Sequence, residues 1–249
     1  FGNVSFDSVA FSDYIWVFVK FSTTNGADGS WRQATLAAGG TVTPVTDNLG
    51  AFIRAADAGT TGANFTLRWN YSADSVPAID GNTRIKLCVT EMVDVPTGSF
   101  IYDAGGIGGT LYNNYGGTSA ITVSATTDIP TGAAAGWPNG YTGFYLAKYE
   151  LSQQQYCDFL NTISSTDAAT RYDATLYNTY GYRIYYNSGS PYGSRYYTDA
   201  QNRGCNFLSW DDCRTYLSWA ALRPMTEMEF EKAARGGSQA GANARTYPW

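Results

Sequence analysis

The chain has four cysteines, Cys88, Cys157, Cys205 and Cys213, and their spacing is the first test of whether it carries reactive chemistry. No two of them form a C-x-x-C pair, so the spacing predicts neither a zinc site nor a redox motif. We expect buried thiols or disulfides. Because Cys157 and Cys213 fall on predicted core faces of helices, they are the preferred disulfide pair in an oxidising compartment.

Histidine is absent from the sequence. This excludes Ser-His-Asp and Cys-His catalysis, histidine-bound zinc and the 2-His-1-carboxylate iron site. Among the carboxylates near two predicted helix starts, capping explains Asp212 and Glu229, and the helix dipole explains Glu227. The glycine-rich run at 105–109 lacks the Lys-Ser/Thr of a phosphate loop. We therefore predict no catalytic, metal-binding or cofactor-binding residue.

A tyrosine-rich stretch, residues 171–203, is the predicted contact surface. Tyrosine combined with Ser, Gly and Asn is typical of recognition surfaces, because the ring gives contact area at low entropic cost and the hydroxyl still forms hydrogen bonds. An equally weighted alternative is a loop whose tyrosines pack on its own domain. The predicted contact residues are Tyr177, Tyr180, Tyr182, Tyr185, Tyr186, Tyr192, Tyr196 and Tyr197.

Two tripeptides, Asp7-Ser8-Val9 and Asp74-Ser75-Val76, resemble the acceptor pattern of a bacterial O-glycosylation system. Ser8 and Ser75 are therefore candidate glycosylation sites, and the alternative is an ordinary Asp-Ser turn. Four aromatic residues of the first 90 offer a platform for sugar stacking, although packing in the core is the commoner role of such residues. They are Trp16, Trp31, Trp69 and Tyr71.

Three capping boxes predict the helices that position the later residues. They pair Ser152 with Gln155, Ser209 with Asp212, and Thr226 with Glu229. Helical spacing then predicts which residues each helix buries. The second helix should bury Cys213, Tyr216, Leu217 and Ala220, and the third should bury Met225, Phe230, Ala233 and Ala234, before Gly236-Gly237 ends it.

The first 90 residues have a β-strand pattern with turn residues between the strands. Strands are predicted at 14–21, 51–54, 65–71 and 84–91, and the first should be covered on both faces because only Lys20 interrupts its apolar run. Low charge (15%) and many aromatic residues (16%) also favour short strands and long ordered loops. We expect an α+β chain with an antiparallel β-sandwich over residues 1–90 and a second domain over 91–249.

The segments Leu208–Asp212, Arg223–Glu231 and Ala233–Gly237 resemble the signature of the formylglycine-generating-enzyme, or sulfatase-modifying-factor, superfamily. Segments 91–100 and 144–160 fit the same family in the right order. The resemblance implies that residues 91–249 form the front part of a C-type-lectin-like domain, with long loops, the predicted helices and the tyrosine-rich insertion at 171–203.

The resemblance also bears on activity, because the family's oxidising enzymes use a cysteine pair to hold copper and attack a substrate thiol. That pair would lie beyond Trp249, and none of the four cysteines here is carried over to its role. We expect a non-catalytic structural, self-assembling or ligand-binding subunit. The alternative is the N-terminal portion of a copper-dependent formylglycine-generating oxidase or a related oxygen-using enzyme, and copper is a cofactor only in that case.

Charge and composition limit the partners. The net charge is −5 without a basic run, which argues against nucleic acid. The sequence has no apolar run of about 18 residues, so no membrane span is predicted. The partner should be a second copy of the chain, as homo-oligomer or polymer, or a surface glycan or protein. Few lysines among many Tyr, Thr, Ser, Asn and Gly favour an extracellular or cell-surface location.

Overall fold

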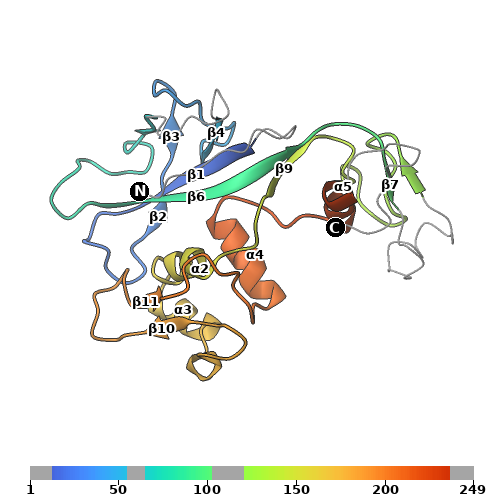
Figure 1. Ribbon diagram of the computed structural model, residues 1–249. Coiled ribbons are helices and arrows are strands. Elements are labelled where there is room, and N and C mark those ends of the chain that lie inside the picture. The colour runs from blue at the N-terminus through green and yellow to red at the C-terminus, as the bar shows by residue number, and fades with distance from the viewer. Residues whose placement is uncertain (1–12, 55–64, 103–120, 236–249) are drawn as a thin grey trace. The chain divides into compact units, whose positions relative to one another are not determined.

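A computed structural model describes residues 13–54, 65–102 and 121–235, with helices and antiparallel sheets that make the chain α+β (Figure 1). Ser8, the glycine-rich run at 105–109 and Gly236-Gly237 lie outside these residues. The β-strands are β1 (Asp13–Ser22), β2 (Arg32–Gln33), β3 (Leu36–Ala37), β4 (Ala51–Arg54), β5 (Arg68–Trp69), β6 (Arg84–Val95), β7 (Phe100–Tyr102), β8 (Ile121–Val123), β9 (Phe144–Ala147), β10 (Ile184–Tyr186) and β11 (Tyr196–Thr198). The helices are α2 (Gln153–Leu160), α3 (Ser165–Arg171), the 3₁₀ turn η1 (Ala174–Leu176), α4 (Trp210–Trp219) and α5 (Glu227–Arg235).

The described chain forms two compact units. Unit 1 contains Asp13–Met92 and Ala147–Pro224, and unit 2 contains Val93–Leu146 and the chain from Met225. The largest sheet has the strand order β2-β1-β6-β9, and β4 also pairs with β1. These units are contact groups within one chain and do not test the domain boundary expected at residue 90, which stays a prediction.

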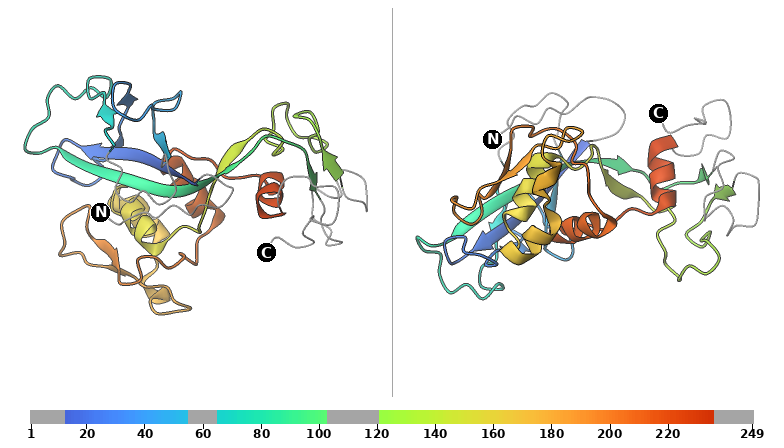
Figure 2. Two further views of the ribbon diagram at one scale, coloured as in Figure 1. Left: turned by 45° about the horizontal axis from the view of Figure 1, so that its top comes forward. Right: turned by 90° about the horizontal axis from the view of Figure 1, so that it is seen from below.

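Strand β1 lies at the centre of unit 1 and is covered on both faces, as its apolar run predicts. Trp16 and Phe18 point to one side and pack with α2 and α4 residues such as Phe159 and Tyr216. Val17 and Val19 point to the other side. Figures 1 and 2 show α2 and α4 on one face of β1 and β6 and β3 on the opposite face, while β4 pairs alongside β1 in the same sheet.

The small layer above β1 contains β3 and β5, which pair as a two-stranded sheet. Leu36, Trp69 and Val76 from this region pack on Phe21 and its neighbours. Asp74 fixes the layer, because its carboxylate accepts hydrogen bonds from Thr35 N at 2.9 Å and Trp69 Nε1 at 2.6 Å. This arrangement leaves the β-sandwich and C-type-lectin-like assignments as predictions.

All three capping boxes are present. Ser152 accepts from Gln155 N while the Gln155 side chain accepts from Ser152 N, and Ser209 and Asp212 form the same reciprocal pair. Thr226 N donates to Glu229 Oε2 at 2.9 Å, and Glu229 N donates to Thr226 Oγ1 at 3.2 Å. The reciprocal bonds satisfy backbone N–H groups that a helix start otherwise leaves unpaired.

The predicted buried face of α5 is wrong. Met225 and Phe230 are exposed, and the buried residues are Met228, Glu229 and Lys232. Capping draws Glu229 inward, and Lys232 Nζ donates to Pro96 O at 2.6 Å and Gly140 O at 2.7 Å. Polar interactions therefore set the helix rotation. Met228 joins Phe100, Tyr102 and Val123 in the core of unit 2.

Candidate functional site

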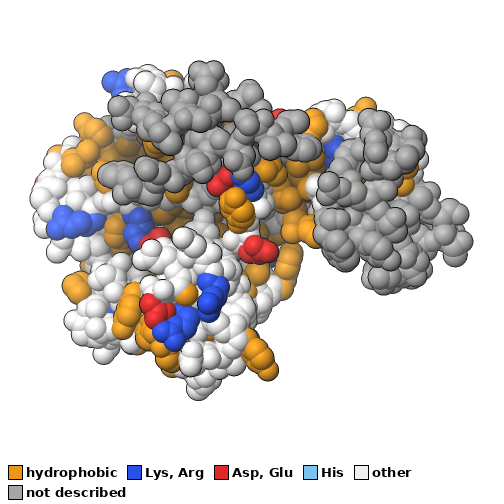
Figure 3. All heavy atoms as spheres, viewed as in Figure 1, with side chains coloured by type: hydrophobic (Ala, Val, Ile, Leu, Met, Phe, Trp, Pro, Cys, Tyr) orange, Lys and Arg blue, Asp and Glu red, His pale blue; other side chains and the backbone are white. Residues whose placement is uncertain are grey.

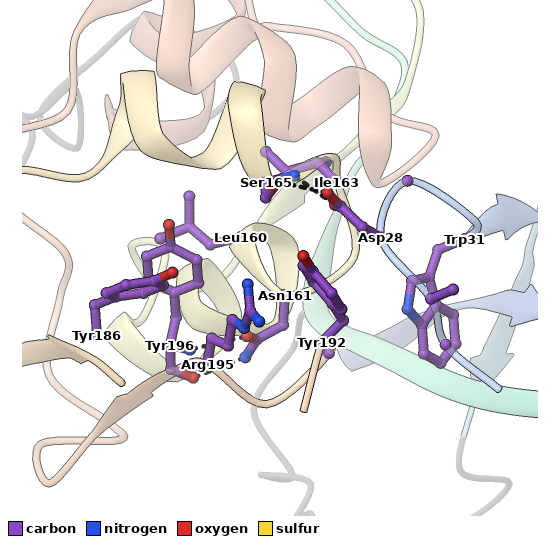
Figure 4. A pocket seen from close by; sticks show the side chains of 14 residues that line it. Asp28, Trp31, Leu160, Asn161, Ile163, Ser165, Tyr186, Tyr192, Arg195 and Tyr196 are labelled. Atoms are coloured by element: carbon purple, nitrogen blue, oxygen red, sulfur yellow. Dashed lines mark hydrogen bonds between the residues drawn. The ribbon is translucent and has the colours of Figure 1, made fainter. Parts of the chain in front are cut away.

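Unit 1 contains a pocket with aromatic walls, which we call the aromatic hollow (Figure 4). Its free volume is about 20 Å³, which is room for about one water molecule. The side chains that define it are Asp28, Trp31, Tyr186, Tyr192, Arg195 and Tyr196. They come from four places in the sequence: the loop after β1, strand β10, the connection between β10 and β11, and the start of β11. The end of α2 forms another part of the wall through Leu160 and Asn161.

Glycines allow the Trp31 indole to lie close to the backbone on two sides. Gly26 and Gly193 both have left-handed φ angles, +72° and +87°. A Cβ atom at Gly26 would lie 3.4 Å from Trp31 Cζ2, and one at Gly193 would lie 3.7 Å from Trp31 Nε1. The indole nitrogen is buried and has no hydrogen-bond partner within the described chain. In Figure 4 this nitrogen is on the edge of the ring that faces Tyr192.

Asp28 joins the hollow to the start of α3. Its carboxylate accepts from Ser165 N at 2.6 Å and from Ser165 Oγ. The hydrogen bond from the Ser165 side chain lowers the pKa of Asp28, and the positive charge of Arg195 acts in the same direction. Asp28 is therefore ionised at neutral pH, and it opposes the Arg195 charge within the hollow.

Arg195 lies over the ring of Tyr192, with the guanidinium carbon 3.7 Å from the ring centroid. Its Nε donates to Ser190 O at 3.1 Å. Within the part of the chain that the structure describes, its two terminal nitrogens have no hydrogen-bond partner. Stacking on the ring holds the planar guanidinium in place.

Two buried amides anchor the tyrosine-rich insertion to α2. Gln153 Nε2 donates to Gly181 O at 2.9 Å, and Gln153 Oε1 accepts from Arg183 N at 2.8 Å. Asn161, the C-cap of α2, donates to Tyr196 O at 2.7 Å and accepts from Tyr196 N at 2.9 Å. These bonds hold β10 and β11 in place and thereby position Tyr186, Tyr192 and Arg195. The sequence analysis missed both amides, which only their place at the ends of α2 could have indicated.

The eight predicted contact tyrosines divide into three groups. Tyr182 and Tyr196 are buried in the core, which removes them from the predicted surface, although the ring of Tyr196 also forms part of the wall of the hollow. Tyr186 and Tyr192 line the hollow and are also partly exposed. The remaining tyrosines, Tyr177, Tyr180, Tyr185 and Tyr197, lie away from the hollow. Of these, Tyr180 is 90% exposed.

A second cluster lies on the other side of the β10–β11 hairpin. Tyr185 and Tyr197 are paired across the strands and stack at 5.0 Å with an angle of 7°. Arg183 bonds to both oxygens of Asp199, and these bonds lower the pKa of Asp199 to about 2. Tyr177 and Tyr185 are joined through their hydroxyl groups. The polar atoms of Tyr177, Arg183, Tyr185 and Asp199 therefore bond to one another.

The cysteines remain free thiols, so the predicted Cys157–Cys213 disulfide is not formed. Electrostatic interactions connect Cys157 with Cys205, and Cys205 with Cys213. Burial raises the pKa of Cys88 and of Cys205 to about 12, and it raises the pKa of Cys157 and of Cys213 as well. These groups are poor thiolates. Among the described residues, no group of three or more His, Cys, Asp or Glu side chains could hold a metal ion.

The other predicted candidates have structural partners. Asp212 caps α4 and pairs with Arg171 at 2.9 Å, and Glu227 accepts from the Tyr102 hydroxyl at 2.6 Å. Ser75 is exposed in a turn with φ +59°, and its glycosylation stays a prediction. Trp16 and Trp69 pack in the core, so Trp31 alone of the four predicted platform residues lines the hollow.

Residues 80–249, more than half of the chain, match the family model described as the Sulfatase-modifying factor enzyme 1-like domain. The chain belongs to this family. Over 52 residues it is also 42% identical to a protein named formylglycine-generating enzyme from Thermomonospora curvata. That stretch is 21% of this chain and 16% of the relative, so the chain spans a small part of the enzyme's length. No solved structure matches the chain.

Proposed function

We propose that this chain of the sulfatase-modifying factor family is a ligand-binding module of an extracellular or cell-surface protein. The observation that carries the proposal is the aromatic hollow, where tyrosine and tryptophan rings meet hydrogen-bond donors that have no partner in the described chain. Concave aromatic sites with a few convergent polar groups are the usual form of a small-ligand site. The partner is a surface glycan or protein.

The proposed fold places a C-type-lectin-like domain after an N-terminal β-sandwich. In support, β1 is covered on both faces, and capped helices occur at the positions expected from the family signature. The tyrosine-rich insertion would then be an addition to the family domain that builds the ligand site. The proposal requires no cofactor.

The charges agree with a ligand other than nucleic acid. On the face that Figure 3 shows, acidic and basic side chains lie beside one another rather than in a basic patch. Nucleic-acid binders need a concentrated positive surface. Of the described helices, none is both long and apolar enough to cross a membrane.

The proposal has a second form, in which the chain is a structural subunit that assembles with copies of itself. Ile85, Leu87 and Val89 alternate along β6 and are all exposed, so they form an apolar row on a long strand. Such rows on sheets promote pairing between copies. Light scattering over a wide concentration range measures this directly, and a strict monomer would contradict it.

The proposed function is tested by applying the native protein to an array of neutral and acidic glycans. Binding of a defined glycan class, reproduced in solution, is the expected result. No binding to any glycan, together with a strict monomer in solution, would contradict the proposal.

The second candidate function is the front portion of a copper-dependent oxidase, and the similarity to the Thermomonospora curvata protein favours it. It needs a cysteine pair beyond Trp249, because the described thiols are not suited to the chemistry. The intact mass of the native polypeptide and its C-terminal peptide sequence test this. A downstream cysteine pair with oxygen uptake on a cysteine peptide would support the enzyme, and a polypeptide without the pair would exclude it.

A further inference from the structure

One edge of β6 has no partner strand along its first half. In the largest sheet β6 lies between β1 and β9, and β9 is the shorter strand. Gly143 lies beside Val95, and Lys148 N donates to Glu91 O at 2.9 Å, so β9 runs along residues 91–95 of β6 (Figure 1). Within the part of the chain that the structure describes, no strand continues this edge along residues 84–90.

The backbone groups of Ile85 and Leu87 point to this open edge. In an extended strand, successive residues direct their N–H and C=O groups to alternate edges. Because Glu91 O accepts its hydrogen bond on the β9 side, Val89, Leu87 and Ile85 face that side as well. Gln155 Nε2 donates to Val89 O at 3.2 Å, which agrees with this direction. The edge therefore offers backbone donors and acceptors to a further strand.

The side chains of the same residues form an exposed apolar row. Ile85, Leu87 and Val89 are 57%, 41% and 43% exposed. The residues between them face the helices instead: Lys86 pairs with a carboxylate of α2 at 2.8 Å, and Cys88 packs against the core. The charge of Lys86 is thus held on the covered face and does not guard the row. Apolar edge strands of this kind are templates for pairing with another chain.

A second copy of β6 fits this edge. When two β6 strands pair antiparallel about a two-fold axis at Leu87, Leu87 faces its own copy and Ile85 faces Val89. Every member of the row then meets an apolar partner. Val89 O has a second lone pair for the new backbone bond, beside the one that Gln155 uses.

Charges select this register. Because residues that point to the edge must face one another, the register changes only in steps that keep the alternation. One neighbouring register places Lys86 opposite Lys86 of the second copy, and the other places Ile85 opposite Glu91. Like charges directly opposite one another are destabilising, and so is a carboxylate that loses its hydration against an apolar side chain. With the axis at Leu87, Lys86 faces Cys88 instead.

We propose that two copies of the chain join through β6, antiparallel and about a two-fold axis at Leu87, so that their sheets become one. The proposal rests on the self-assembling form of the proposed function and names its partner and its contact. A contact of this symmetry closes on itself, so the product is a dimer rather than a filament. Each copy contributes one short strand, and the dimer should therefore dissociate on dilution.

Sedimentation velocity over a wide range of concentrations tests the dimer. The wild type should pass from monomer to dimer as the concentration rises. Leu87→Lys places two ammonium groups opposite one another and removes an apolar contact from both copies, so the dissociation constant should rise about tenfold or more. Leu87→Glu should have the same effect. An equimolar mixture of the two variants should associate again, because the mixed pair brings opposite charges together at the axis.

Ile79→Lys is the matched control, because Ile79 is 55% exposed and lies outside β6; its association should equal that of the wild type. The substituted side chains are all exposed, and near-UV circular dichroism confirms the fold of each variant. Association that Leu87→Lys leaves intact, or that the mixture fails to restore, would overturn the β6 contact while leaving self-assembly in place. A strict monomer would overturn both, and the glycan array then decides separately on the ligand-binding form of the proposed function.

Discussion

At the scale of single residues, Lys20 is the most unusual side chain of unit 1. It is 6% exposed on the helix-covered face of β1, where its ammonium donates to Trp219 O at 2.5 Å and lies over the Trp219 ring. Burial lowers the pKa of Lys20 from 10.5 to about 8. In the sequence, Lys20 is the one charged residue of an apolar strand. The sequence could not show that a carbonyl at the end of α4 would accept a hydrogen bond from its ammonium.

Lys20 should make stability depend on pH. Between pH 8 and 10.5 the unfolded chain keeps the Lys20 proton while the folded chain loses it, so the free energy of unfolding rises with pH in this window. Lys20→Met removes this contribution. The free energy of unfolding of the wild type minus that of the variant should rise by about 3 kcal/mol across the window.

Urea denaturation of both proteins at several pH values measures the Lys20 effect. The comparison is needed because buried cysteines act in the opposite direction: burial raises the pKa of Cys88 to about 12, so its contribution to stability falls above pH 9. Because the charges of Lys20 and Cys88 also interact, both proteins should carry Cys88→Ala, which removes this effect from the difference. Parallel curves for wild type and Lys20→Met would contradict the prediction.

At the scale of elements, α2 is the support of the tyrosine-rich insertion. Its start is fixed by the Ser152 capping box, and its two ends carry the amides of Gln153 and Asn161 that bond to the insertion. The register between β10 and β11 then sets Tyr185 opposite Tyr197 and Tyr186 opposite Tyr196. The Tyr185–Tyr197 pair belongs to the exposed cluster, and the Tyr186–Tyr196 pair faces the hollow and the core.

Replacing Gln153 should loosen the insertion. Gln153→Leu leaves Gly181 O and Arg183 N without their buried partners and should cost about 3 kcal/mol in the free energy of unfolding. Amide hydrogen exchange across residues 181–198 should increase as well. Gln154→Leu is the matched control, because that amide makes one long contact of 3.4 Å with Asp158. Equal stability of the two variants would show that Gln153 does not anchor the insertion.

The helices were more predictable from the sequence than the site. Ser152, Ser209 and Thr226 carry local capping signals, and each helix begins where its box predicts. The buried face of α5 was not predictable from apolar spacing, because the carbonyls of Pro96 and Gly140, far away in sequence, draw Lys232 inward. The aromatic hollow is a non-local feature in the same way, since Trp31 and Tyr192 are brought together only by the fold.

At the scale of the whole molecule, membership of the family does not by itself give this chain the family's cysteine chemistry. The chain belongs to the sulfatase-modifying factor family. Its described residues nevertheless offer buried thiols of raised pKa rather than a thiolate pair. The same chain presents an aromatic hollow and exposed tyrosines, on which the proposed ligand binding rests.

The thiols provide a test at this scale. At pH 8 the native protein should react slowly with a thiol reagent, because burial raises the pKa of all four cysteines. After unfolding without a reductant, four thiols should react rapidly. Finding only two would contradict the free-thiol structure and restore a disulfide such as Cys157–Cys213.

The most direct test of ligand recognition in the aromatic hollow is the ¹H–¹⁵N resonance of the Trp31 indole, assigned by its loss in Trp31→Phe. On titration with a methyl glycoside, this resonance should shift and saturate, because Trp31 lines the hollow and its Nε1 has no hydrogen-bond partner among the described residues. The other indole resonances should move little. A glycoside that binds while the Trp31 resonance stays in place would contradict the assignment of the hollow as the binding site.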